Sequence, residues 1–199
     1  MNHTKKAALN NRFWIHLVFL LVIIILTFSA YSNVLHGEFL FDDLLIDENK
    51  LPQSPSAYKD LNISNPLKSG VRPVVSFTFS LNHYFFGKDT FNYHLTNVII
   101  HILNGMLVYV FIYITLTLHS GKAEGDFAIE RWIAFLTALF FSLHPIQTES
   151  VSYIIQRYES LSSMFYLISL IVFIFASKPS ALRPLSSIAL YIIFILGFI

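Results

Sequence analysis

Two adjacent acids, Asp42 and Asp43, are placed by type and position to act as a general base. They close the segment FLFDD at residues 39–43, where apolar side chains lead directly into the two carboxylates. A carboxylate at a membrane boundary is partly removed from water, which tunes its proton affinity and suits it to deprotonate a hydroxyl group. Alternatively, the two acids are ordinary surface residues of a solvated loop. The pair therefore needs support from its surroundings.

A basic residue with a possible role in phosphate binding heads the segment RPVVSFTFSLNHYFFG, residues 72–87. Pro73 suits the first turn of a helix, and a helix here would be largely apolar with one polar face, as in a helix lying at a membrane interface. The alternation of polar and apolar residues between 76 and 82 also allows a strand. Arg72 could bind a lipid phosphate or serve only as an interfacial anchor. The polar face of the expected helix consists of Arg72, Ser76, Ser80 and His83.

A stripe of four polar residues lies within the apolar segment that follows. His94, Asn97, His101 and Asn104 are spaced by 3, 4 and 3 residues, which places them on one side of a helix. Polar groups in a membrane span face protein or a water-filled cavity, so the stripe indicates either a functional surface or hydrogen bonding between helices. Seven residues separate the two histidines by roughly 10 Å along the axis, which disfavours a shared metal ion.

A fourth polar segment, HPIQTESVSYIIQRYE, covers residues 144–159. The His-Pro pair ends one apolar run, and we expect a new helix to start near Thr148. Arg157 would lie at the edge of its polar face, at the level of the acidic pair. The residues along that face would be Glu149, Ser152, Gln156, Ser160 and Ser163.

The elements that must position these residues are membrane spans, because 55% of the 199 residues are hydrophobic and only 13% are charged. In soluble domains, about a quarter of the residues are charged. A net charge of +1, with no basic block, argues against nucleic-acid binding, and the absence of cysteine excludes disulfides and thiolate zinc sites. The sequence predicts an all-α integral membrane protein, a polytopic bundle of about five helices.

Uncharged runs of about 20 residues place the spans. Residues 1–12 would form a cytoplasmic N-terminus, residues 33–92 a long outer loop carrying the interfacial helix, and the last run stops inside its apolar stretch, as in a truncated sequence. A cleaved signal peptide is the alternative for the first run. With the N-terminus in the cytoplasm, the short segments between spans place more lysines and arginines inside than outside. This distribution favours a cytoplasmic N-terminus. The expected spans are about 13–32, 93–118, 131–144, 158–177 and 185–199.

The ordered set FDD, RPVVSFTFSLNHYFFG, YHLTNVIIHIL and RWIAFLTALFFSLHPIQTESVSYIIQR resembles the N-terminal part of the transmembrane and tetratricopeptide-repeat (TMTC-like) O-mannosyltransferases. These belong to the GT-C membrane glycosyltransferases, so residues 13–199 would be the N-terminal part of such a domain. The resemblance implies a catalytic role for Asp42 and Asp43 in the outer loop. It also implies further spans and tetratricopeptide repeats in the intact protein, and QRYES places Glu159 one position later than the acid in related sequences.

The resemblance further implies transfer of a sugar, with mannose as the candidate, from a polyprenyl-phosphate donor to an acceptor hydroxyl on a protein Ser or Thr or on a glycan. The reaction would take place at the outer or luminal face of a bacterial inner membrane or the endoplasmic reticulum. The lipid-linked sugar is a co-substrate and no cofactor is certain, although a divalent cation at Asp42 and Asp43 is one option. Donor phosphate would be bound by Arg72, His144 and Arg157, with support from His83, His94, Asn97, His101 and Glu149.

Two other classes of function compete with the enzyme. A non-catalytic membrane anchor or scaffold for a repeat domain would keep the same spans without the chemistry. A transporter or channel would need charged or broken helices near the midplane of the membrane, and the spans carry formal charge only at their ends, at Arg131 and Glu159. The downstream sequence would separate the enzyme family from an isolated anchor.

Overall fold

The computed structural model describes residues 3–39, 43, 72–120 and 127–176, with side chains from residue 12 onward. Every secondary-structure element in these residues is a helix, which confirms the all-α prediction. Four helices are long: α1 (His3–Tyr31), α5 (Thr90–His119), α6 (Ala128–Leu143) and α8 (Arg157–Ala176). The short ones are η1 (Ser32–His36), α4 (Pro73–Phe86), η4 (Pro145–Gln147) and α7 (Thr148–Ser152).

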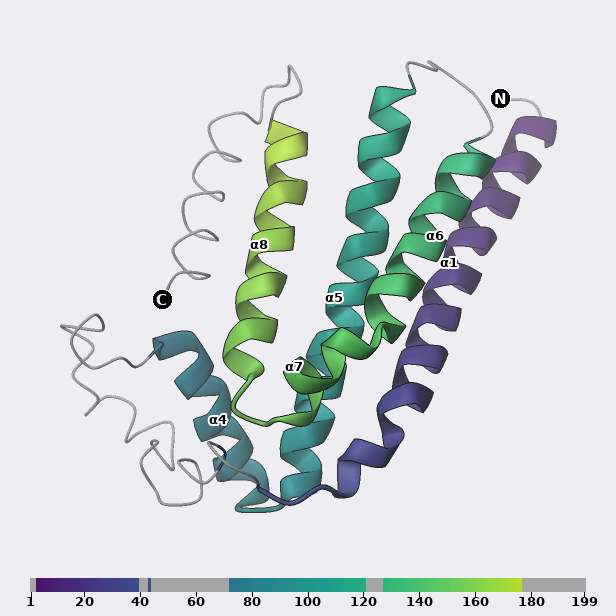
Figure 1. Cartoon of the computed structure of the whole chain (residues 1–199). Helices are drawn as coiled ribbons and strands as arrows, with labels where there is room; N and C mark the ends of the chain where they lie inside the picture. The colour runs from purple at the N-terminus through teal and green to yellow at the C-terminus, as the bar shows by residue number, and fades with distance from the viewer. Residues whose placement is uncertain (1–2, 40–42, 44–71, 121–126, 177–199) are drawn as a thin grey trace.

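Helix α5 is the centre of the bundle, and α1, α6 and α8 pack around it (Figure 1). The chain runs along the four long helices in alternating directions. The start of α1, the end of α5, the start of α6 and the end of α8 lie at one end of the bundle. Helices α4 and α7 lie at the opposite end, so the polar segments 72–87 and 144–159 meet there.

The surface of the bundle is apolar, as expected of a protein that lies in lipid. Arg12–His36, Thr90–His119 and Arg157–Ala176 are long and apolar enough to cross a membrane, and the described residues provide a fourth span if α6 and Pro145–Ser152, which are bent by 48°, count as one. Because each helix satisfies its own backbone hydrogen bonds, such segments are stable in hydrocarbon. The chain is thus a multi-pass membrane protein. Its exposed apolar side chains include Phe13, Trp14, Ile25, Phe140 and Phe173.

Local signals explain where two of the helices begin and end. Pro73 occupies the first turn of α4, and Gly87 ends this helix with φ of 62°, a left-handed conformation that favours glycine. The segment is therefore a helix and not a strand. Helix α5 begins before the predicted span because Asp89 caps it, accepting a hydrogen bond from the Phe91 N–H at 3.2 Å. The predicted span 185–199 lies outside the described residues.

The continuous helix predicted from Thr148 is wrong. Helix α7 ends at Ser152, Tyr153 is extended with φ −81° and ψ 127°, and α8 starts only at Arg157. The sequence through this break, SYIIQR, contains no Pro or Gly to mark it. The polar face expected along one helix is therefore divided among α7, the break and the start of α8.

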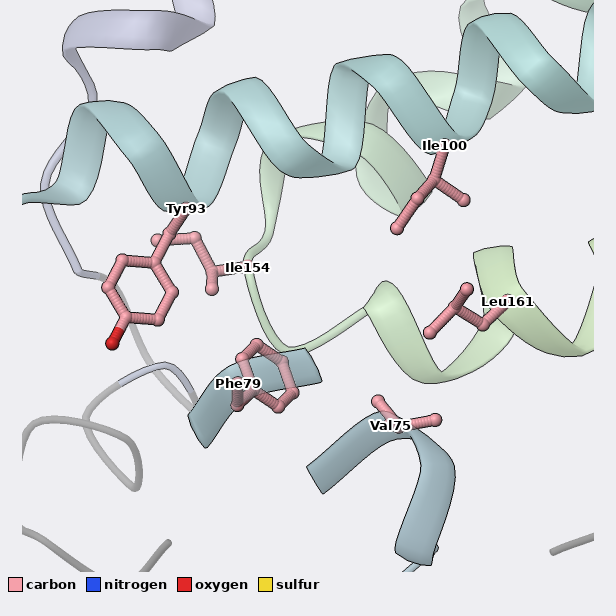
Figure 2. Close-up of a cluster of buried hydrophobic side chains, with 6 residues drawn as sticks. All are labelled: Val75, Phe79, Tyr93, Ile100, Ile154 and Leu161. Atoms are coloured by element: carbon pink, nitrogen blue, oxygen red, sulfur yellow. The ribbon is translucent and has the colours of Figure 1, made fainter. Parts of the chain in front are cut away.

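Buried apolar side chains hold the break and α4 against the bundle. Figure 2 shows Val75 and Phe79 of α4 facing Tyr93 and Ile100 of α5, with Ile154 from the break and Leu161 of α8 between them. Each of these side chains is less than 9% exposed. This cluster joins four separate segments at the polar end of the molecule.

A close approach of α5 and α6 depends on one glycine. A Cβ atom added at Gly105 would overlap the Ser142 Oγ, whereas the Ser142 Cβ would lie at an ordinary 3.5 Å. Small residues of this kind let helices in membranes approach each other closely. The Ser142 hydroxyl has no hydrogen-bond partner within the described residues.

We expect Gly105→Ala to destabilise the bundle by about 1–3 kcal/mol, because the added methyl group overpacks this contact. Ser142→Ala alone should change stability little, and the double variant should recover most of the loss because only ordinary 3.5 Å contacts with the Ser142 Cβ and the Ile23 Cγ2 remain. Thermal unfolding of the detergent-solubilised protein measures all three variants. Equal stability of Gly105→Ala and the double variant would contradict this packing.

Candidate functional site

The guanidinium of Arg157 is fully buried where α4, α5 and α8 meet. Its Nε donates to Asn97 Oδ1 at 2.9 Å, and its Nη1 donates to Asn82 Oδ1 at 2.6 Å and to Thr78 Oγ1 at 3.4 Å. Its Nη2 donates to the Tyr93 carbonyl at 3.1 Å, and the cation lies 4.2 Å from the centre of the Phe79 ring. These acceptors are all neutral oxygens. We refer to Arg157 and these partners as the arginine network.

This burial corrects the prediction that Arg157 binds donor phosphate. A phosphate would have to displace buried hydrogen bonds and the covering aromatic ring, and no part of Arg157 is exposed. The fixed fork of the guanidinium instead suits it to connecting several elements. The structure assigns Arg157 to positioning the helices.

Two polar side chains form hydrogen bonds to the backbone of the break between α7 and α8. Asn97 Nδ2 donates to the carbonyls of Tyr153 and Ile154 at 3.0 and 3.2 Å, while Asp43 Oδ1 accepts from the Ile155 N–H at 2.7 Å. These bonds satisfy backbone groups that the interrupted helix would otherwise leave unpaired. The Asp43 residue is only 1% exposed. Asp42 lies outside the described residues.

Arg72, unlike Arg157, is partly exposed. It stands at the N-cap of α4, where its side chain is 42% exposed and its Nη1 lies 3.6 Å from the Glu159 Oε1. The same nitrogen donates to the Ser162 hydroxyl at 3.3 Å. Such a half-exposed ion pair is weak, so an incoming anion can compete for the guanidinium.

The predicted histidines differ in their surroundings. His144 Nδ1 accepts from the Ile146 N–H at 3.2 Å, so its other ring nitrogen is the one available to donate. His101 is buried, with its Nε2 3.0 Å from the Ser142 carbonyl, and so joins α5 to α6. His83 is half-buried on the last turn of α4, where its carbonyl accepts the Gly87 N–H at 2.8 Å.

An open pocket of about 750 Å³ lies beside this end of the bundle. Glu149 of α7 and His94 of α5 line it, together with Glu38, which follows η1. The two glutamates are exposed, whereas His94 is 2% exposed. Tyr153 also lines it, two residues before the Ile155 N–H that donates to Asp43. The pocket thus adjoins the region of the candidate base.

A metal site finds no support from the described side chains. In that part of the chain, no three His, Cys, Asp or Glu residues converge as ligands of one ion would. The predicted option of a cation at Asp42 and Asp43 involves one residue outside it.

Sequence reasoning missed Asn82, Thr78 and Glu38. Asn82 is a buried amide on a largely apolar helix, and a buried amide needs hydrogen-bond partners. Nothing in the local pattern indicated that this partner would be Arg157, 75 positions away. Glu38 belongs to the pocket only because η1 turns the chain beneath α7.

The sequence is similar to several curated proteins named protein O-mannosyl-transferases. It is 32% identical over 158 residues to TMTC2 of Mus musculus and 33% identical over 158 residues to TMTC2 of Homo sapiens, in each case over 73% of this chain and 17% of the relative. It is 32% identical to F38B6.6 of Caenorhabditis elegans over 164 residues, 77% of this chain and 22% of the relative. The chain therefore spans only about a fifth of these relatives. No family model and no solved structure matches it.

We expect Arg157→Ala to destabilise the protein by about 3–5 kcal/mol, because it leaves the buried amide oxygens of Asn82 and Asn97 without their donor. Arg157→Lys should recover only part of this loss, since an ammonium lacks the planar fork. Thermal unfolding in detergent is the measurement, with Arg72→Ala as the control that changes stability by less than about 1 kcal/mol. An unfolding temperature unchanged by Arg157→Ala would refute the positioning role.

Proposed function

The chain belongs to the TMTC-like family of protein O-mannosyl-transferases, and on that premise we propose that the protein is a membrane glycosyltransferase. It transfers a sugar, mannose by analogy with its relatives' names, from a polyprenyl-phosphate donor to a Ser or Thr hydroxyl of a protein. The observation that carries the proposal is the position of Asp43. This buried carboxylate accepts a hydrogen bond from the Ile155 N–H, two residues after Tyr153, which lines an open pocket at the end of the bundle that also holds α4.

The chemistry requires one base and one anion-binding group. A carboxylate of the Asp42–Asp43 pair accepts the proton of the acceptor hydroxyl as its oxygen attacks the anomeric carbon of the sugar. The bond between that carbon and the phosphate oxygen breaks, and its electron pair leaves with the polyprenyl phosphate. Attack opposite the leaving group inverts the anomeric centre.

Arg72 is the residue best placed to stabilise the departing phosphate. Its guanidinium is half-exposed, and the Glu159 carboxylate that it contacts at 3.6 Å can be exchanged for a more highly charged phosphate. His144 can add a second hydrogen bond through the ring nitrogen that does not cap η4. Arg157 acts indirectly by holding α4, which carries Arg72.

The polar end of the bundle faces the outer or luminal side in this proposal. The start of α1, which includes Lys5, Lys6 and Arg12, lies at the opposite end, and short basic segments favour the cytoplasmic side. A polyprenyl-linked donor then reaches Arg72 from the adjacent membrane leaflet.

We expect Asp42→Asn and Asp43→Asn, made in the complete protein, to reduce sugar transfer at least about 100-fold through loss of the base. Asp43→Asn retains an oxygen that can accept the Ile155 N–H, so its membrane abundance and thermal stability should stay near wild type. Radiolabelled sugar transfer from a polyprenyl-phosphate donor to an acceptor peptide is the measurement. Full transfer by both variants would favour a scaffold over an enzyme.

Arg72→Ala should raise the KM for the lipid-linked donor about 10-fold or more while leaving the KM for the acceptor peptide unchanged, because it removes a charge-assisted hydrogen bond to the phosphate. Arg72→Lys should show a smaller increase. The matched control is Lys88→Ala, a cation at the far end of α4. A donor KM that is the same in wild type and Arg72→Ala would remove Arg72 from the phosphate site.

A further inference from the structure

Helix α4 turns its polar side chains toward the protein. Ser76, Ser80 and Asn82 are buried against the bundle together with Val75 and Phe79, and each of the five is less than 9% exposed. A helix on the surface of a soluble protein does the opposite, since its polar face meets water and its apolar face meets the core. The environment on the outer side of α4 is therefore not water alone.

The outward face of α4 is an apolar stripe. Phe77, Tyr84 and Phe85 are 39%, 62% and 67% exposed. Val74 and Leu81 are half-buried on the same side, because residues spaced by 3, 4 and 7 share one side of a helix. We refer to these five residues as the α4 stripe. It carries no charge, and contact with water would be unfavourable along the whole length of the helix.

The contacts of α4 place the start of this stripe beside a membrane span. Arg72 donates to the hydroxyl of Ser162 at 3.3 Å, and Ser162 lies in the second turn of α8. Helix α8 is apolar enough to cross a membrane, and its Tyr166 and Phe173 are 63% and 59% exposed. Lipid that surrounds α8 at this level therefore also reaches the outward face of α4.

The far end of α4 lies further from the centre of the membrane. It joins the start of α5, where the Tyr93 hydroxyl donates to the Gly87 carbonyl at 3.3 Å, and Figure 1 shows this end beyond the start of α8. The 30 residues of α5 extend about 45 Å, which exceeds the ~30 Å of the hydrocarbon core. The end of α4 thus reaches the headgroup level, where aromatic side chains such as Tyr84 are enriched in membrane proteins.

We propose that the α4 stripe is a lipid-binding surface, immersed in the membrane leaflet at the polar end of the bundle. Phe77 lies at the edge of the hydrocarbon, whereas Tyr84 and Phe85 lie among the headgroups. Helix α4 is then held from two sides, by the arginine network within the protein and by lipid outside it. This inference does not depend on the proposed chemistry, because a scaffold with the same fold would bind lipid in the same way.

Spin labelling tests the proposal directly, because the 199 residues contain no cysteine. The single variants Phe77→Cys, Leu81→Cys and Phe85→Cys are made in the complete protein, with any cysteine outside these residues replaced by serine. Each is labelled with a nitroxide in phosphatidylcholine nanodiscs. Power saturation compares collisions with oxygen, which concentrates in lipid, and with nickel ethylenediaminediacetate, which stays in water. The references are Phe173→Cys for lipid and Glu38→Cys, an exposed position after η1, for water.

We expect the logarithm of the oxygen-to-nickel collision ratio to be positive at positions 77 and 81, as at Phe173, and negative at Glu38. It should decrease from position 77 to position 85 as the helix rises toward the headgroups. Negative values at positions 77 and 81 would place the stripe in water and overturn the proposal. Few collisions with either reagent would also overturn it, in favour of a protein segment that covers the stripe. Because the labels point outward, the buried side of α4 stays intact.

Discussion

The arrangement of the polar end depends on a buried positive charge whose acceptors are all neutral. A guanidinium removed from water must have its N–H groups satisfied, since each unpaired buried donor is unfavourable. Arg157 meets this requirement with oxygens from two other helices, Asn82 and Thr78 of α4 and Asn97 and Tyr93 of α5. The three helices can therefore adopt only positions that bring these oxygens together. Helix α4, which is too short to span a membrane, is held in place largely by this requirement and the apolar cluster beside it.

The same network explains why the chain breaks between α7 and α8. Asn97 uses its oxygen for Arg157 and its nitrogen for the carbonyls of Tyr153 and Ile154, so one amide connects the guanidinium to the break. Asp43, from the segment between η1 and α4, accepts the Ile155 N–H. Interrupting a helix in an apolar environment is tolerable only when its freed backbone groups find such partners. The break then directs α7 across the bundle end and makes it a wall of the pocket.

The sequence was informative where periodicity and local signals determine structure. Long uncharged runs predicted the helices at α1, α5, α6 and α8, and Pro73 and Gly87 marked the ends of α4, because these features act over a few residues. The break at 153–156 was not predictable, since SYIIQR looks like continuing helix and its interruption is imposed by Asn97 and Asp43 from distant parts of the chain. The groups that enclose Arg157 also come from distant parts of the chain, so the sequence predicted an accessible position for this residue. A charge seen in sequence does not reveal whether distant amides will enclose it.

The polar stripe on α5 shows how structure separates residues that sequence treats alike. Asn97 and Asn104 donate to backbone carbonyls of the break and of α8, and His101 contacts the Ser142 carbonyl of α6. These three side chains are used to connect helices, which is the packing role that polar groups have in membrane proteins. His94 has the same spacing and the same burial, and it packs against Gly37, which follows η1, beside the pocket. The first member of the stripe therefore meets the turn that follows η1, whereas the other three connect α5 to the break, to α6 and to α8, so one helix face holds every neighbouring segment of the polar end.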